Sequence, residues 1–251
     1  MTDAAPAQGA SPPHRPVAGR PLARQHQAAS AATRPYGLRS VAPPVAYARH
    51  PVGAGVVAKS ALDRVGALLL LVVLGPIIVF VAVVVALSSP GPVLYRQRRV
   101  GRDGEMFEFL KFRTMVPAAD AEMPALDPHN EADGLLFKIQ ADPRVTAAGR
   151  WLRRLSLDEL PQLWNVLRGE MSLVGPRPLP VDPTLFLGHE RVRLLVKPGI
   201  TGLWQVSGRS ELTWAQTVHL DTRYVTEWSF LLDVYILLRT PLAVLRGRGA
   251  W

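Results

Sequence analysis

VGALLLLVVLGPIIVFVAVVVAL, residues 65–87, is the stretch that decides the fold of this chain. It contains no charged side chain, and a helix of this length, at about 1.5 Å per residue, can cross a hydrocarbon core of about 30 Å. Gly75 and Pro76 stand at its middle. Because proline removes a backbone hydrogen bond and clashes with the preceding turn, we expect a bend there, with a helix, a break and a second helix. Each half then measures about 16 Å, so the two halves can enter and leave a membrane by one face.

The flanks of this run favour a re-entrant helix over a transmembrane span. Lys59 and Arg64 precede it, and four arginines follow it closely. Since Lys and Arg accumulate on the cytoplasmic side, basic residues at both ends suit a hairpin with both ends in the cytoplasm. A kinked span and a buried core helix are the alternatives, because membrane helices tolerate proline when neighbours satisfy the freed backbone groups. The four arginines are Arg96, Arg98, Arg99 and Arg102.

Composition limits the classes of function. The 251-residue chain has a net charge of +9 and no cysteine, which excludes disulfides and thiolate nucleophiles. A basic protein beside a bilayer is expected to meet anionic lipid and phosphorylated substrates, and no helix-turn-helix, zinc-finger or RNP pattern points to nucleic acid. Residues 1–58 are rich in Ala, Pro and Arg without hydrophobic periodicity, which predicts a disordered tail. A membrane helix at 59–92 and a cytoplasmic catalytic domain at 93–251 are expected to follow.

The pattern after residue 92 predicts an α+β domain that is mainly helical. Two strand-like segments, 93–98 and 106–112, flank a turn with Gly and Asp and predict a small β-hairpin. The acidic, proline-bearing stretch 117–134 predicts an exposed helix and loop. Apolar residues at helical spacing predict one helix from Arg144 and another over 158–167.

The C-terminal stretch 231–245 is rich in leucine but keeps Asp233 and Arg239. This composition predicts amphipathic helices that lie in the membrane interface, and nearby aromatic side chains support that prediction. An amphipathic helix on a soluble core is the alternative. The aromatic residues are Trp214, Tyr224, Trp228 and Tyr235.

The segment RRLSLDELPQLWN, residues 153–165, places two arginines before Asp158 and Glu159 at a predicted helix start. Free backbone N–H groups and the helix dipole attract phosphate there, and arginine adds forked donors. A carboxylate in this position can attack phosphorus and form an acyl phosphate. Mg²⁺ is the expected helper, because both reactants are negatively charged. The alternative is structural: Asp158 would be a helix N-cap, and Ser156 with Glu159 has the capping-box spacing.

Further basic residues lie in rigid loops or at strand ends. Two prolines flank Arg177 and hold its backbone extended, which suits an oxyanion clamp; a structural salt bridge is the alternative. Lys111 and Arg113, in the sequence KFRT, add two more cations. Neither this segment nor KPGITG at 197–202 is a Walker loop.

From Lys59 to Arg246 the chain resembles the bacterial sugar transferases of the polyprenyl-phosphate glycosyl-1-phosphate transferase group. Several long motifs stand in the family's order, which makes the resemblance specific. They are Lys59 and Asp63 before the apolar run, Pro76 within it, KFRTM at 111–115, FK at 137–138, DPRVT at 142–146, the segment around Asp158 and Glu159, GPRP at 175–178, and residues 197–209.

The resemblance implies a monotopic phosphoglycosyl transferase on the cytoplasmic face of the bacterial inner membrane. It would transfer a sugar 1-phosphate from a UDP-sugar to undecaprenyl phosphate and release UMP, which initiates exopolysaccharide, capsule or other glycoconjugate assembly. Asp158 would be the nucleophile that forms a phosphosugar intermediate, with Glu159 as its dyad partner and Mg²⁺ bound at Asp158. The resemblance is compatible with a homodimer. The expected phosphate-binding residues are Arg153, Arg177, Lys111 and Arg113.

The chain departs from the family's pattern in two respects. Gly75 stands where members often carry serine, so a local hydroxyl hydrogen bond is lost, although glycine bends at least as easily. Larger members add a bundle of membrane helices and another domain, so assembly through those parts is not assumed here. The stretch GLWQVSGR at 202–209 is more similar to hexose-phosphate transferases, which favours glucose or galactose. A non-enzymatic membrane scaffold and transfer of a nucleotide or phosphate group are the competing functions.

Overall fold

The structure is a computed structural model that describes residues 53–247. Most of the predicted tail, residues 1–52, lies outside the described residues. The helices and strands, apart from short 3₁₀ turns, are α2 (Ala54–Ser88), β1 (Leu94–Val100), β2 (Met106–Phe112), α3 (Met123–Leu126), α4 (Ala147–Arg154), α5 (Gln162–Arg168), β3 (Ser172–Val174), β4 (Gly199–Thr201), α6 (Leu203–Ser207), α7 (Trp214–Thr226) and α8 (Phe230–Arg246). The described part is therefore α+β and mainly helical, as the sequence predicted.

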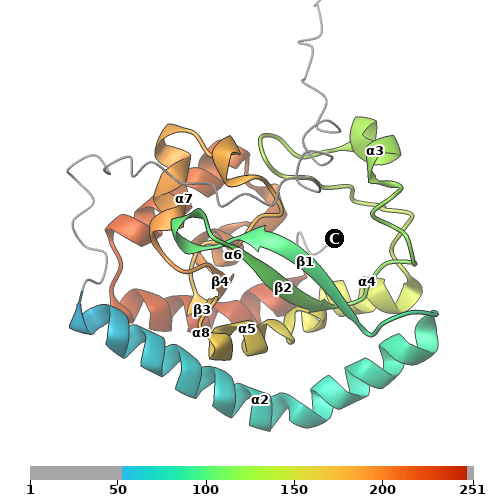
Figure 1. Cartoon of the computed structure of the whole chain (residues 1–251), viewed down its shortest axis with the longest axis horizontal. Helices are drawn as coiled ribbons and strands as arrows, with labels where there is room; N and C mark the ends of the chain where they lie inside the picture. The colour runs from blue at the N-terminus through green and yellow to red at the C-terminus, as the bar shows by residue number, and fades with distance from the viewer. Residues whose placement is uncertain (1–52, 248–251) are drawn as a thin grey trace, which may run out of the picture.

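Helix α2 carries the apolar run and is one continuous helix. It bows near its middle, and the rest of the domain lies on its concave side (Figure 1). The prediction of two helices separated by a break is wrong, because a single helix runs through Pro76. Pro76 removes one backbone hydrogen bond, and the helical backbone continues through it. Helix α2 also begins within the stretch 1–58 that was assigned to the tail, because AGVVA at 54–58 contains alanine, the strongest helix former, and no helix breaker except one glycine.

One face of α2 packs on the domain along most of the helix. Ala67, in the first half, belongs to a cluster of buried side chains with Phe109 and Val166. Val81 and Val85, in the second half, belong to another cluster with Phe112 and Leu152. The opposite face of α2 exposes Leu68, Leu69, Val72, Val73, Val79, Phe80 and Val83.

The predicted hairpin is confirmed. Strands β1 and β2 pair antiparallel, from Leu94 opposite Phe112 to Val100 opposite Met106. The turn between them needs a left-handed backbone at Asp103, with a φ of 57°, a conformation that Asp adopts more readily than most residues. The register puts residues 95, 97 and 99 on the same face as 107, 109 and 111.

A parallel pair of short strands forms a second, separate sheet. Strand β3 pairs with β4, with Ser172 opposite Gly199 and Val174 opposite Thr201. The chain leaves β3 at Gly175, and a Cβ atom at Gly199 would lie 2.1 Å from the Gly175 nitrogen. Only glycine permits this approach, so Gly175 and Gly199 together fix where the GPRP loop begins.

The remaining helices follow the predicted order. The predicted exposed helix and loop are confirmed, as α3 lies within 117–134. Helix α4 begins at Ala147 rather than Arg144, because Thr146 Oγ1 accepts a hydrogen bond from the Gly149 amide and caps the helix there. Helix α8 buries Asp233 and Ile236 and is amphipathic. Its other side exposes Phe230, Leu231, Leu238, Leu242 and Leu245.

Candidate active site

Asp158 lies in a 3₁₀ turn, η3 (Leu157–Glu159), between α4 and α5. Ser156 reverses the chain before it with a left-handed φ of 54°, and no side chain caps η3. Helix α5 begins only at Gln162, so the interpretation of Asp158 as a helix N-cap is wrong. The residue is 8% exposed. Within residues 53–247, its carboxylate makes no hydrogen bond and no ion pair within 4.0 Å, so its oxygens are free to react.

Positively charged side chains from three segments surround Asp158. Burial raises the pKa of its carboxyl group and the neighbouring Glu159 adds to the rise, while the surrounding cations oppose it. This concentration of positive charge in a partly dry site is suited to a second anion, such as a phosphate group, beside the carboxylate. The cations are Lys111 from β2, Arg153 from α4 and Arg177 from the loop after β3.

Glu159 and Arg177 form an ion pair inside the site. The Arg177 guanidinium donates a hydrogen bond from Nη2 to Glu159 Oε1. Burial alone would raise the pKa of Glu159, but the charge and hydrogen bond of Arg177 lower it. Glu159 therefore stays ionised at neutral pH. The salt bridge that was the alternative interpretation of Arg177 exists, and it lies within the candidate site.

The backbone of Arg177 is held from behind by Arg193, a residue that sequence reasoning missed. Arg193 lies in the 3₁₀ segment η5 (Gly188–Leu195), and its Nη2 donates to the Arg177 carbonyl at 2.7 Å. The same nitrogen lies 3.1 Å from Asp221 Oδ2, and both side chains are buried. No local sequence signal marked Arg193, because its partners lie in other parts of the chain.

Arg99 is a further cation of the candidate site. From the sequence it was noted only as one of the arginines that follow the apolar run. Its Nη1 donates to the Pro178 carbonyl at 2.9 Å, and Cζ lies 3.8 Å from the centre of the Phe109 ring. Burial first, and repulsion by Arg177 second, lower its pKa to about 9. The hairpin register was the missing signal, since Arg99 shares a face with the predicted site residue Lys111.

Lys111 and Arg153, two of the expected phosphate-binding residues, both lie near enough to Asp158 to lower its pKa. The Lys111 ammonium lies 4.9 Å from the Tyr95 ring centre. Burial, then repulsion by Arg99 and Arg153, lower the pKa of Lys111 to about 7. Arg153 Nε donates to Thr114 Oγ1 at 3.0 Å, which leaves its two terminal nitrogens for a ligand.

Arg113 is not brought into the site. Its guanidinium donates to the carbonyls of Val85, Ser89 and Pro92, at and just beyond the end of α2. Strand β2 ends at Phe112, so strand alternation no longer places Arg113 beside Lys111. The last carbonyls of a helix need donors from outside the helix, and Arg113 supplies them.

A magnesium ion fits Asp158 only together with a phosphorylated ligand. Within the described part of the chain, no three His, Asp or Glu side chains gather to hold a metal ion. Glu159 is bound by Arg177, whereas the Asp158 carboxylate has no hydrogen-bond or ion-pair partner among residues 53–247. Mg²⁺ is often held by one or two carboxylates plus substrate phosphates and water, so Asp158 with a bound diphosphate meets that requirement.

Comparison with known proteins adds a family match over the same region. The profile of the bacterial sugar transferase family matches residues 54–247. Over 197 residues the chain is 44% identical to the galactosyl transferase CpsE of Streptococcus agalactiae, covering 78% of this chain and 44% of that protein. Over 207 residues it is 42% identical to the exopolysaccharide production protein ExoY of Rhizobium meliloti, covering 80% and 91%.

A third relative carries a more specific name. The chain is 42% identical over 198 residues to the undecaprenyl-phosphate galactose phosphotransferase of Salmonella typhimurium, covering 77% of this chain and 41% of that protein. The chain thus spans less than half the length of CpsE and of the Salmonella protein, and most of ExoY.

Proposed function

The chain belongs to the bacterial sugar transferase family, and from this premise we propose that it transfers a sugar 1-phosphate from a UDP-sugar to undecaprenyl phosphate or a similar polyprenyl phosphate. UMP is the other product, and the lipid-linked sugar starts an exopolysaccharide or other glycoconjugate. The carrying observation is the buried carboxylate of Asp158, which has no partner among the described residues and lies among cations. A diphosphate supplies the negative charge that such a site lacks.

In the first step, an Asp158 carboxylate oxygen attacks the phosphorus atom that bears the sugar. A bond forms between that oxygen and phosphorus, the bond to the bridging diphosphate oxygen breaks, and UMP leaves with the bridging oxygen and its electron pair. The product is an acyl phosphate, which splits one difficult transfer into two easier ones. Lys111, Arg153 and Arg177 stabilise the charge that develops on the phosphoryl oxygens.

In the second step, a phosphate oxygen of the polyprenyl phosphate attacks the same phosphorus atom. The bond between Asp158 and phosphorus breaks, the carboxylate is restored, and the sugar is linked to the lipid by a diphosphate. Glu159 remains ionised against Arg177 and fixes that guanidinium beside the reacting group. Lys111, with a pKa of about 7, can hold or release a proton there. Mg²⁺ bound at Asp158 with the diphosphate would neutralise part of its charge.

The bowed shape of α2 supports a re-entrant placement in the cytoplasmic membrane, which we include in the proposal. Ala67 in one half and Val85 in the other both pack on the same domain. A straight span would draw that domain, with its buried charges, into hydrocarbon at a high cost. Helix α2 is long and apolar enough to cross a membrane by composition, yet the packing of both its halves on one domain favours entry and exit on the same face.

A continuous apolar surface would then face the lipid. Exposed apolar side chains on both α2 and α8 would contribute to it, and the exposed rings of Trp151 and Trp164 suit the interface. A domain at this depth can meet a water-soluble UDP-sugar and a phosphate on a buried lipid chain. We propose UDP-galactose or UDP-glucose as the donor, because galactose and glucose are the sugars in the relatives' names.

Release of UMP tests the proposed function. Purified protein with Mg²⁺ and undecaprenyl phosphate is incubated with each of several UDP-sugars, and the Asp158→Asn variant serves as the inactive form. Asp103→Asn is the matched control, since Asp103 is exposed on the hairpin turn and asparagine accepts its left-handed backbone. We expect UMP from wild type and control, and a mass increase on Asp158 when the acceptor is withheld. Absence of UMP with every UDP-sugar, or full activity in Asp158→Asn, would refute it.

A further inference from the structure

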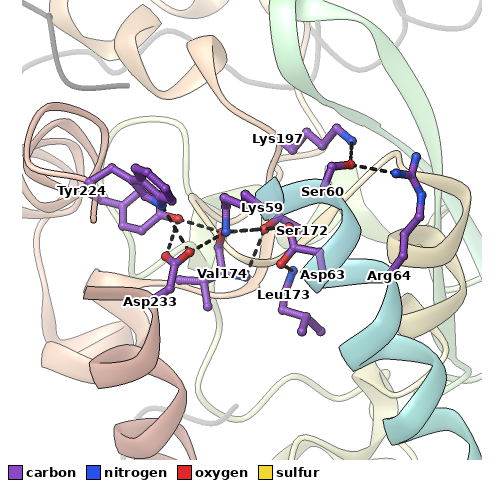
Figure 2. Close-up of polar contacts among 11 residues, drawn as sticks. Lys59, Ser60, Asp63, Arg64, Ser172, Leu173, Val174, Lys197, Tyr224 and Asp233 are labelled. Carbon is purple, nitrogen blue, oxygen red and sulfur yellow. Dashed lines mark hydrogen bonds and ion pairs between the residues drawn. The ribbon is translucent and has the colours of Figure 1, made fainter. Parts of the chain in front are cut away.

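A second group of cations lies at the start of α2, apart from the cations that act on Asp158. A small pocket that opens to solvent is present there. Figure 2 shows Lys197 and Arg64 reaching toward the same point from different elements. Ser60, Lys197 and Arg102 line the pocket, together with the carboxylate Asp63 and the ion-paired Lys59, and Arg64 reaches Ser60 from beside it.

Ser60 brings two of these cations together. Arg64 Nη1 donates to Ser60 Oγ at 2.8 Å, and Lys197 Nζ donates to the same oxygen at 3.2 Å (Figure 2). Arg64 Nε also donates to the Leu167 carbonyl at 3.3 Å, which fixes the guanidinium. Gly169 leaves the space open, because a Cβ atom there would lie 2.4 Å from Arg64 Nη2 and 3.6 Å from Lys197 Nζ.

The two cations lack an acidic partner. In the described part of the chain, no carboxylate lies within 4.0 Å of the charged nitrogens of Arg64 or Lys197. Lys59, by contrast, is paired with Asp233 at 2.6 Å. Burial lowers the pKa of Lys197, and the charges of Arg64 and Arg102 lower it further, while the charge of Asp63 opposes this change. Like charges held this close repel each other, so the arrangement favours a bound anion.

The position of the pair suggests where that anion comes from. Arg64 is the last residue before the uncharged run 65–87, and Leu68 and Leu69, one turn later, are exposed. Lipid phosphates lie just outside the hydrocarbon, at the depth where such a run ends. Clusters of Lys and Arg at this depth attract anionic lipids.

We propose that Arg64, Lys197 and Ser60 form a binding site for the phosphate group of an anionic phospholipid, separate from the site of Asp158. The forked donors of Arg64 and the ammonium of Lys197 hold the phosphate, whereas Arg102, at the edge of the pocket, is already paired with Asp103. The bound lipid fixes the depth at which α2 enters the membrane. This inference rests on the membrane placement in the proposed function. Free phosphate offers the same chemistry, so the test separates the two sources.

Short-chain lipids in a non-ionic detergent test the site on the full chain. Dihexanoyl phosphatidylglycerol, dihexanoyl phosphatidylcholine and inorganic phosphate are titrated separately, and binding is read from the shift in thermal unfolding. We expect a shift with phosphatidylglycerol that phosphatidylcholine and inorganic phosphate do not match. In Arg64→Gln/Lys197→Gln the apparent Kd for phosphatidylglycerol should rise about 25-fold, since each cation near a lipid headgroup contributes about a factor of five.

Three variants serve as controls. Arg98→Gln/Arg150→Gln removes two exposed positive charges elsewhere and should bind as wild type does. Arg153→Gln alters the site of Asp158 and should keep the shift. Ser60→Ala keeps both charges and removes their common hydroxyl, so it reports on the site if the double variant does not fold; we expect weaker binding.

Equal loss in Arg98→Gln/Arg150→Gln would assign the effect to net charge and overturn the site. A larger shift with inorganic phosphate than with phosphatidylglycerol would assign the site to a soluble anion and overturn the lipid proposal. The outcome is independent of catalysis. If the protein releases UMP but does not prefer phosphatidylglycerol to phosphatidylcholine, this lipid site alone is refuted. If it prefers phosphatidylglycerol but releases no UMP, the proposed function alone is refuted.

Discussion

Lys59 Nζ lies 2.6 Å from Asp233 Oδ2, an ion pair that joins the start of α2 to α8 across 174 positions of sequence (Figure 2). Both side chains are largely buried. Tyr224 and Trp228 also donate hydrogen bonds to Asp233. The contact fixes the two helices whose exposed apolar faces form the proposed lipid-facing surface.

Lys59→Met should destabilise the protein, because it leaves the Asp233 carboxylate buried without its cation. Removing one partner of a buried pair costs about 3–5 kcal/mol, and we expect the lower end since Tyr224 and Trp228 still donate. Thermal unfolding in detergent measures the change. Glu227→Gln, which breaks the exposed pair with Arg223, is the control and should leave the midpoint unchanged. Equal midpoints for Lys59→Met and wild type would contradict this prediction.

Arg177→Ala should lower the rate of UMP release by about 10²–10³-fold, the usual loss when one preorganised donor to a developing charge is removed. Because Arg177 lowers the pKa of Glu159, its loss should also shift the acidic limb of the pH–rate profile to higher pH. Steady-state rates from pH 5 to 9 measure both effects. An unchanged acidic limb would mean that Glu159 protonation does not control the rate.

Lys111 should make the protein more stable as pH rises above 7. Its pKa is about 7 in the folded protein and 10.5 for an ordinary lysine, so between these values the unfolded chain binds a proton that the folded protein does not. The free energy of unfolding then increases with pH. Arg99, with a pKa of about 9, acts in the same direction only at higher pH. Denaturant unfolding at pH 7 and 9 should show a smaller rise in Lys111→Met than in wild type; identical rises would exclude this role.

Arg113→Gln and Arg153→Gln should separate stability from catalysis. Arg113 satisfies carbonyls at the end of α2, so its loss should lower the unfolding midpoint through unpaired polar groups, at about 1–3 kcal/mol. Arg153→Gln should leave the midpoint near wild type and raise the KM for the UDP-sugar. The two measurements are made on the same preparations. A raised KM with a normal unfolding midpoint in Arg113→Gln would contradict this prediction and indicate that Arg113 binds the substrate phosphate.

Pro76→Leu should straighten α2 and favour a true span. The chain has no cysteine, so single cysteines introduced ahead of α2 and at Glu105 can be labelled in intact cells. In wild type both should react only after the membrane is opened to the cytoplasm, whereas in Pro76→Leu one of them should become accessible from outside. External labelling of either position in the wild type would contradict the re-entrant placement.

Local sequence determined the parts of this protein whose signals lie within a few residues of one another. The uncharged run with Pro76 predicted a long apolar segment with a bend, though not that one helix continues through the proline. Alternation predicted the hairpin, and Asp158 with Glu159 marked the centre of the candidate site. Periodicity and turn chemistry act over one or two turns, so a linear sequence reports them directly.

Tertiary structure alone decided which charges gather around Asp158 and which serve the framework. Arg99 enters the site through the register of β1 with β2, while Arg113, two residues from Lys111, turns to the end of α2. Arg193 donates a hydrogen bond to the Arg177 carbonyl, and Lys59 forms an ion pair with Asp233. Each side chain carries the same charge in the sequence. Its role depends on which carboxylate, carbonyl or ring the fold brings within a few ångströms, because a buried charge is stable only where packing supplies a partner.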